Sequence, residues 1–73
     1  MIKVKLSALK RLRKEAIEED DLFLFVFLKS LVSSLVKKEQ CGGGVWVYFD
    51  YPEEVFKRLI QDGDLKDSEV NFV

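Results

Sequence analysis

Apolar and polar side chains alternate over the first seven residues of the chain. The alternating positions are Ile2, Val4 and Leu6 on one side and Lys3, Lys5 and Ser7 on the other. A period of two predicts a strand with one buried face and one solvent-facing face. Because no turn and second strand follow directly, this strand has no neighbour in the sequence for its backbone hydrogen bonds. We therefore expect its partner to come from elsewhere.

The pattern then changes to a helical period. Leu9, Leu12 and Ala16 predict a helix over about residues 8–19, with Ser7 available as its cap. Asp20 or Asp21 can cap a second helix over about residues 21–39. One apolar stripe follows this second helix and comprises Leu24, Phe25, Leu28, Leu31, Val32, Leu35 and Val36. The segment LFLFVFL also fits a strand, because short apolar runs are ambiguous, but the length of the stripe favours a helix.

Three glycines, Gly42–Gly44, separate this pattern from the rest of the chain, and we interpret them as a hinge that ends the second helix. An extended, aromatic segment is expected over residues 45–51. The segment PEEVFKRLIQDG predicts a third helix, with Pro52 at its first position and Gly63 just past its end. The tail 64–73 adds a short extended piece that packs through Val70 and Phe72. Residues 1–40 and 41–73 are the two expected units.

Length and composition limit the chemistry of the chain. With 73 residues it makes one small domain at most, and such chains bury only about 60% of their unfolded surface. The chain has no histidine and one cysteine, Cys41. An intramolecular disulfide, a Cys/His zinc site and histidine acid–base catalysis are therefore excluded, and we expect no cofactor, no metal and no enzymatic activity. An apolar content of 48% in so short a chain favours an oligomer.

Charge is distributed unevenly, although the net charge is only −1. Residues 1–14 contain six cations and no acid, whereas residues 15–21 contain five acids. A basic arm followed by acidic segments is typical of an end that faces a polyanion. The alternative is a solvated helix surface.

The apolar stretch from Leu22 to Val36 is too short for a membrane span. It has 15 residues, interrupted by Lys29 and serines, against about 20 needed to cross a bilayer. The N-terminus, with alternating lysines, does not read as a signal peptide. We expect no membrane partner and a cytoplasmic location.

A second copy of the chain is the simplest partner for the first strand. Pairing of two such strands across a two-fold axis gives an antiparallel ribbon. The expected dimer core is then Ile2, Val4, Leu6, Phe25, Leu28, Leu31, Val32 and Leu35. The outer face of the ribbon presents Lys3, Lys5 and Ser7, which could contact bases in the major groove of double-stranded DNA. Flanking phosphates would be contacted by Lys10, Arg11, Arg13 and Lys14. The alternative is that Lys3 and Lys5 merely form a solvated edge that protects the strand from aggregation.

Residues 1–39, read as strand, helix and helix, resemble the ribbon-helix-helix proteins of the MetJ/Arc type, which are dimeric transcriptional regulators. The length and order of elements are also similar to small regulators carried by archaeal viruses. The resemblance implies a mainly α homodimer with a two-stranded intersubunit ribbon, here with an extra C-terminal helix. It further implies sequence-specific binding of DNA as a regulator or repressor, in the host cytoplasm for a viral protein. The junction EEDDL departs from the family, because it lacks glycine and Ser/Thr and its carboxylates would repel a phosphate.

Two other hypotheses remain from the sequence. A protein-interaction module, antitoxin-like or inhibitory, would use residues 45–73, where Trp46, Tyr48, Phe49 and Tyr51 are typical of interface hot spots. The same four aromatic residues could instead fill a core. If LFLFVFL is a strand, the chain resembles β-grasp sulfur carriers, but it ends in Asn71-Phe72-Val73 rather than in the Gly-Gly that those carriers need.

Overall fold

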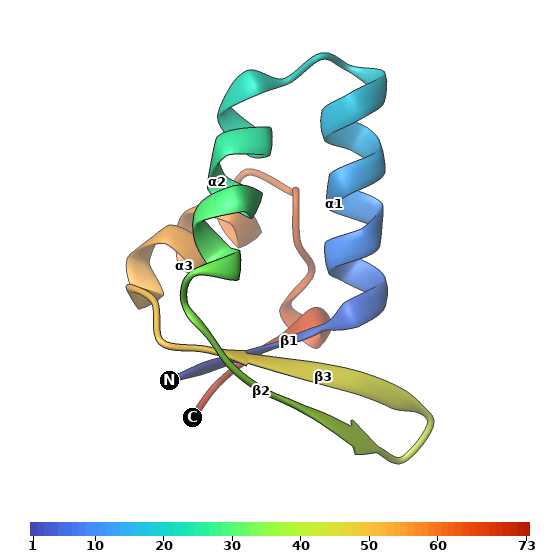
Figure 1. Cartoon of the computed structure of the whole chain (residues 1–73), viewed down its shortest axis with the longest axis vertical. Coiled ribbons are helices and arrows are strands. Elements are labelled where there is room, and N and C mark those ends of the chain that lie inside the picture. Colours follow the sequence, from blue (N-terminus) through green and yellow to red (C-terminus); the bar gives the residue numbers. More distant parts are fainter.

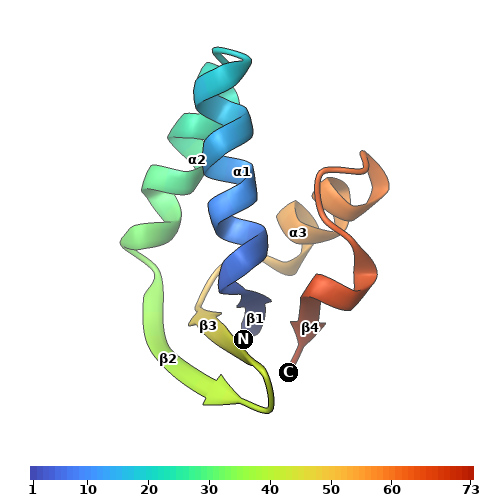
Figure 2. The same ribbon diagram turned by 90° about the vertical axis from the view of Figure 1, so that its right-hand side faces the viewer.

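All four strands belong to one antiparallel sheet, and the three α-helices lie on the same side of it (Figures 1 and 2). The computed structural model describes residues 1–73. The order of strands across the sheet is β2-β3-β1-β4. The elements in chain order are β1 (Ile2–Lys5), α1 (Leu6–Glu18), α2 (Leu22–Val32), β2 (Leu35–Cys41), β3 (Gly44–Phe49), α3 (Glu53–Gln61), the 3-10 turn η1 (Asp67–Glu69) and β4 (Val70–Phe72).

The first strand finds its partners within its own chain. β1 pairs with β3 on one side and with β4 on the other, so that Val4 lies opposite both Val47 and Val70. Because both edges of β1 are hydrogen-bonded, no edge is left for the same strand of a second copy. The prediction of a mainly α, ribbon-helix-helix homodimer is therefore wrong, and the fold is a small α/β one with three helices and a four-stranded sheet.

The second helix begins where the sequence predicted and ends seven residues early. The side chain of Asp21 caps α2, accepting the backbone N–H of Leu24 at 3.1 Å. The helix ends at Val32, and residues 35–41 form β2, which pairs with β3. Pairing of residues 35–41 with β3 thus outweighs the helical period of the local apolar stripe, which continues through Val36.

The glycines form a hairpin turn rather than a helix-ending hinge. Gly42 and Gly43 join β2 to β3 with φ angles of +36° and +92°. Two consecutive residues with positive φ are typical of the type I′ turn, whose twist matches that of the flanking strands. The expected boundary between residues 40 and 41 therefore falls near the tip of this hairpin.

The remaining elements agree with the sequence patterns. The helix α1 begins at Leu6, slightly before the expected cap at Ser7. The helix α3 follows Pro52, and Gly63 comes after its end with φ +85°. The tail forms β4, with Val70 buried and Phe72 half-buried, as predicted.

The core lies between the helices and one face of the sheet. Ile2 and Val4 of β1 are fully buried there, as is Phe56 of α3. The ring of Phe56 meets those of Phe27 and Tyr51 edge to face, with centroids 5.8 and 6.0 Å apart. These contacts join α2, α3 and the segment between β3 and α3.

The long apolar stretch is divided between α2 and the start of β2. None of the helices combines the length and the apolar character that crossing a bilayer requires.

Candidate nucleic-acid interface

No other element covers the face of the sheet turned away from the helices, which we call the open face (Figure 1). Of its two aromatic side chains, Trp46 is half-buried and Tyr48 is only 9% exposed. Side chains alternate along a strand, so the neighbours of buried Val4 and Val47 point to this side. Cross-strand pairs then bring polar and aromatic side chains together, because directly opposed residues share a face. The open face carries Lys3, Lys5, Lys37, Glu39, Trp46, Tyr48 and Asn71.

Three lysines on this face lie over two aromatic rings. The ammonium nitrogen of Lys3 is 5.2 Å from the ring centroid of Trp46 and 5.9 Å from that of Tyr48. That of Lys5 is 5.7 Å from Trp46, and that of Lys37 is 4.6 Å from Tyr48. These distances are typical of cation–π contacts. The two rings of β3 therefore hold three positive charges, two from β1 on one side and one from β2 on the other.

One carboxylate, that of Glu39, shares the face with the lysines. It lies 3.4 Å from the ammonium of Lys37 and accepts a hydrogen bond of 3.3 Å from the hydroxyl of Tyr48. The hydrogen bond and charge of Lys37 lower the pKa of Glu39 below its ordinary value. The carboxylate therefore stays ionised and offsets one of the three positive charges.

A hollow of about 360 Å³ connects the open face to the start of α1. Lys5 and Trp46 line it from the sheet, Ser7 and Lys10 from the helix, and Gly42–Gly44 from the hairpin turn. Ser7 is exposed at the first turn of α1, and so it lies beside Lys5 rather than in line with Lys3 and Lys5 on a strand.

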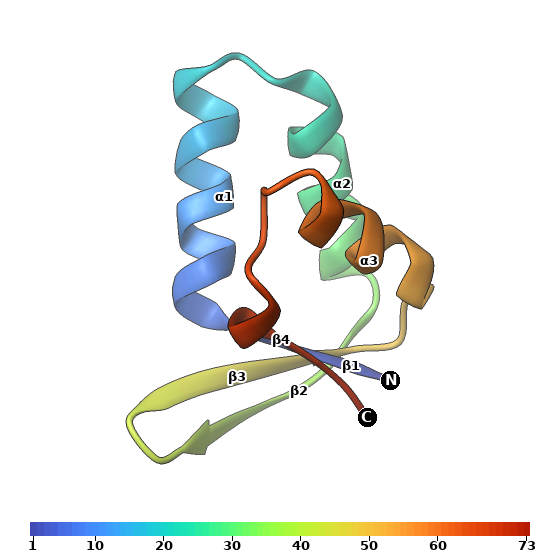
Figure 3. The same cartoon turned by 180° about the vertical axis from the view of Figure 1, so that it is seen from behind.

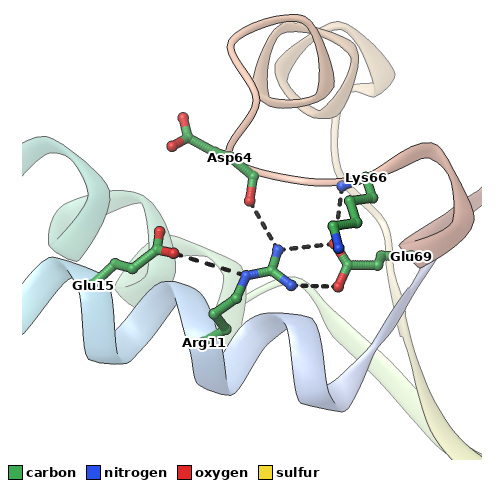
Figure 4. Close-up of polar contacts among 5 residues, drawn as sticks. All are labelled: Arg11, Glu15, Asp64, Lys66 and Glu69. Atoms are coloured by element: carbon green, nitrogen blue, oxygen red, sulfur yellow. Dashed lines mark hydrogen bonds and ion pairs between the residues drawn. The ribbon is translucent and has the colours of Figure 1, made fainter.

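The four cations predicted to contact phosphate separate into two groups. Lys10, Arg13 and Lys14 are exposed on α1, where Lys14 pairs with Glu18 at 3.8 Å. Arg11 points the other way, toward the C-terminal segment. Figure 4 shows its guanidinium donating to both carboxylate oxygens of Glu69 and, at 3.0 Å, to the carbonyl of Asp64. Arg11 is thus occupied by a contact within the chain.

The segment that holds Arg11 runs from the end of α3 to η1 beside α1 (Figure 3). Glu69 is 8% exposed and also accepts the backbone N–H of Lys66 at 2.9 Å. The hydrogen bond from Arg11 is the main cause that lowers the pKa of Glu69 to about 2. The ion pair therefore fastens the tail of the chain to α1.

The residues predicted to form a dimer core lie in different environments. Those buried in the core of the single chain are Ile2, Val4 and Leu31. Leu6 and Leu28 are half-buried. The exposed ones are Phe25, Val32 and Leu35.

Sequence reasoning missed the role of β3 as the middle of the open face. The signal that could have found it is the alternation of Trp46 and Tyr48 with Val47 and Phe49, which predicts a strand with both rings on one face. Phe49 is buried, and the ring centroid of Tyr51 lies 5.8 Å from that of Phe27. The aromatic segment therefore divides between the open face and the core.

No protein-family model matches the chain, and no curated protein or solved structure does so either.

Proposed function

We propose that this protein binds single-stranded nucleic acid on the open face of its sheet. The observation that supports this function is the position of three lysines, Lys3, Lys5 and Lys37, over the rings of Trp46 and Tyr48. A sheet face that combines cations with aromatic rings suits single strands, because phosphates pair with the cations and exposed bases stack on the rings.

The lysines would bind phosphate first, and the rings would then stack with bases. In the free protein each ammonium lies over a ring, a contact worth about 0.5–1 kcal/mol at an exposed site. A phosphate offers a stronger partner, because a charge-assisted hydrogen bond gains more than a cation–π contact. Movement of Lys3 or Lys5 toward a phosphate then uncovers Trp46 for a base.

The shape of the site favours single strands over duplexes. The major groove of B-DNA admits a helix or a two-stranded ribbon, whereas Lys3 and Lys5 lie on an internal strand of a four-stranded sheet. Sequence-specific binding of double-stranded DNA and a role in transcription stay predictions. A cytoplasmic location also belongs to this proposal.

The only tryptophan of the chain, Trp46, provides a direct probe. Titration with oligo(dT) or oligo(U) should quench its fluorescence, because stacked bases quench indole emission. Lys37 is paired with Glu39, so Lys3 and Lys5 supply the phosphate contacts of the wild-type protein. The logarithm of the association constant should then fall against the logarithm of salt concentration with a slope of about −1.4.

Two variants and one control test the face itself, with binding followed by the anisotropy of a labelled oligonucleotide. Trp46→Leu and Lys3→Ala should each weaken binding about five- to tenfold, as stacking and phosphate contacts are worth about 1–3 kcal/mol. Lys57→Ala is the matched control, because Lys57 also lies over an aromatic ring, that of Phe72, at 5.7 Å, but on α3. Equal binding by all three variants, or tighter binding of a duplex of the same length, would contradict the proposal.

A further inference from the structure

Exposed apolar side chains are concentrated in one part of the molecule. Ten large apolar residues are exposed, and the only two outside residues 17–36 are Met1 and Val73 at the chain ends. The other eight are Ile17, Leu22, Phe23, Phe25, Val26, Val32, Leu35 and Val36. Large contiguous apolar patches are rare on monomeric proteins and mark interaction sites.

The helix α2 carries the centre of this surface. Its buried side is formed by Leu24, Phe27 and Leu31. On its outer side Leu22, Phe25, Val26 and Val32 follow one another at helical spacing, with exposed fractions of 73, 39, 64 and 71%. We refer to these four residues as the α2 stripe.

A groove of about 410 Å³ adjoins the C-terminal end of the stripe. Its apolar lining comes from Leu6, Leu9, Leu28, Leu31, Val32 and Phe49. Its cationic lining is Lys10, Arg13 and Lys38. The groove therefore suits an apolar side chain that is accompanied by acids.

The chain itself has such a segment at the other end of α2. Leu22, at the start of the helix, follows Glu19, Asp20 and Asp21. Glu19 and Lys38 are both exposed, and neither forms an ion pair within the chain. The acids at one end of α2 are thus complementary to the cations at the other end.

We propose that a second copy of this chain covers the α2 stripe, with the two α2 helices packed antiparallel about a two-fold axis. In this arrangement Leu22 of each copy reaches the groove beside Val32 of the other. The acids Glu19 and Asp20 of each copy then face the cationic residues Lys10, Arg13 and Lys38 of the other. A two-fold interface requires this kind of self-complementary surface.

A standard interface buries about 800 Å² on each partner, which is about a sixth of the 5016 Å² surface of this chain. Lys29 lies within the stripe, with its ammonium 5.4 Å from the ring centroid of Phe25. Its stem can stay on the apolar surface while the charge extends to solvent.

This dimer does not depend on nucleic-acid binding. The α2 stripe belongs to the helical layer, whereas Lys3 and Trp46 lie on the opposite face of the sheet (Figure 2). Both surfaces can therefore be occupied at once.

Sedimentation equilibrium between about 1 and 200 µM measures the association. The wild-type chain should be a dimer in the micromolar range. Val26→Asp should raise the dissociation constant at least tenfold, because it places a charge at the centre of the stripe. Val73→Asp, at an equally exposed apolar position outside the stripe, is the control and should leave the constant unchanged. Circular dichroism confirms that both variants fold.

A charge-exchange pair tests the orientation. Glu19→Lys and Lys38→Glu should each weaken self-association at low salt, because each variant opposes like charges across the interface. Their equimolar mixture should associate more tightly than either variant alone, since both contacts then join opposite charges. A wild-type chain that stays monomeric to 200 µM, or a dimer unaffected by Val26→Asp, would overturn the proposal and leave the stripe to a different occupant.

Discussion

Arg11 of α1 and Glu69 of η1 are 58 positions apart in the sequence and form a bidentate ion pair. One of its hydrogen bonds, from Nη2 to Oε1, measures 2.8 Å. Glu69 is the one charged residue that the fold buries. Because Arg11 also holds the carbonyl of Asp64, it fixes both ends of the short segment that leads into β4. The pair therefore positions the strand that covers the outer edge of β1.

Replacement of Glu69 by Gln should destabilise the fold by about 2–3 kcal/mol. Gln keeps the shape and an acceptor for the N–H of Lys66, but it removes the buried counter-charge of Arg11. The guanidinium then keeps only its more exposed ion pair with Glu15, at 3.8 Å. Urea denaturation at pH 7 measures the change in the free energy of unfolding. Glu53→Gln, which removes a carboxylate from an exposed pair with Lys57, is the control and should cost less than about 0.5 kcal/mol.

The same pair predicts how stability depends on pH. The folded pKa of Glu69 is about 2, against an ordinary value of 4.5. As the pH falls, the unfolded chain therefore binds a proton at this carboxyl before the folded chain does. The contribution of Glu69 is complete above about pH 4.5 and is lost as the pH falls toward 2. In Glu69→Gln the loss of unfolding free energy between pH 4.5 and 2 should be smaller than in the wild type by about 2–3 kcal/mol. Urea denaturation at several pH values measures it, and an equal pH dependence of the two proteins would contradict the low pKa of Glu69.

Gly43 is required by the geometry of the β2–β3 turn. Its φ of +92° is strained for any residue with a Cβ atom, although nothing lies within 4 Å of the added atom. Gly43→Ala should therefore cost about 1–2 kcal/mol in unfolding free energy. Gly44→Ala is the control, because Gly44 has ordinary strand geometry and equally open surroundings. An equal effect of the two substitutions would show that the turn adopts another conformation.

The hydroxyls of Ser30 and Tyr51 lie 2.9 Å apart and link α2 to the residues before α3. Ser30 also donates to the carbonyl of Phe27, so Tyr51 is the donor in the pair. Ser30→Ala and Tyr51→Phe should each cost about 1 kcal/mol. The double variant should cost about 1 kcal/mol less than the sum of the two, as thermal or urea unfolding would measure. Strict additivity would mean that the two hydroxyls do not interact.

The sequence predicted elements well wherever their local signals were complete. Asp21 marked the start of α2, and Pro52 with Gly63 enclosed α3. The errors concerned pairing between distant segments. Nothing local to Ile2–Lys5 indicates that its neighbours are residues 46–49 and 70–72, because strand pairing depends on the whole fold. A second copy of the chain is the simplest partner for β1 only if residues 35–41 are helical. With these residues in β2, the chain forms a sheet of its own that includes β1.

The candidate site was predictable only in the part that depends on local patterns. The polar side of β1 was evident, and Lys3 and Lys5 lie on the open face as the alternation indicated. Trp46 of β3 joins them through pairing with β1, and Lys37 of β2 joins them through pairing with β3. No periodicity in the sequence reveals these pairings. The position of Arg11 was not predictable either, because its partner Glu69 comes from the opposite end of the chain.

Glu39 is the residue whose removal should strengthen nucleic-acid binding. Lys37 keeps its pKa low, so at neutral pH Glu39 places a negative charge beside the lysines of the open face. Glu39→Gln should raise the affinity for oligo(dT) about three- to fivefold at low salt, because the substitution removes a negative charge that repels the phosphates. The release of Lys37 should also steepen the salt dependence by about 0.7. Glu54→Gln, an exposed carboxylate in the first turn of α3, should change neither quantity. Unchanged binding by Glu39→Gln would mean that phosphates do not reach β2, and would restrict the site to β1 and β3.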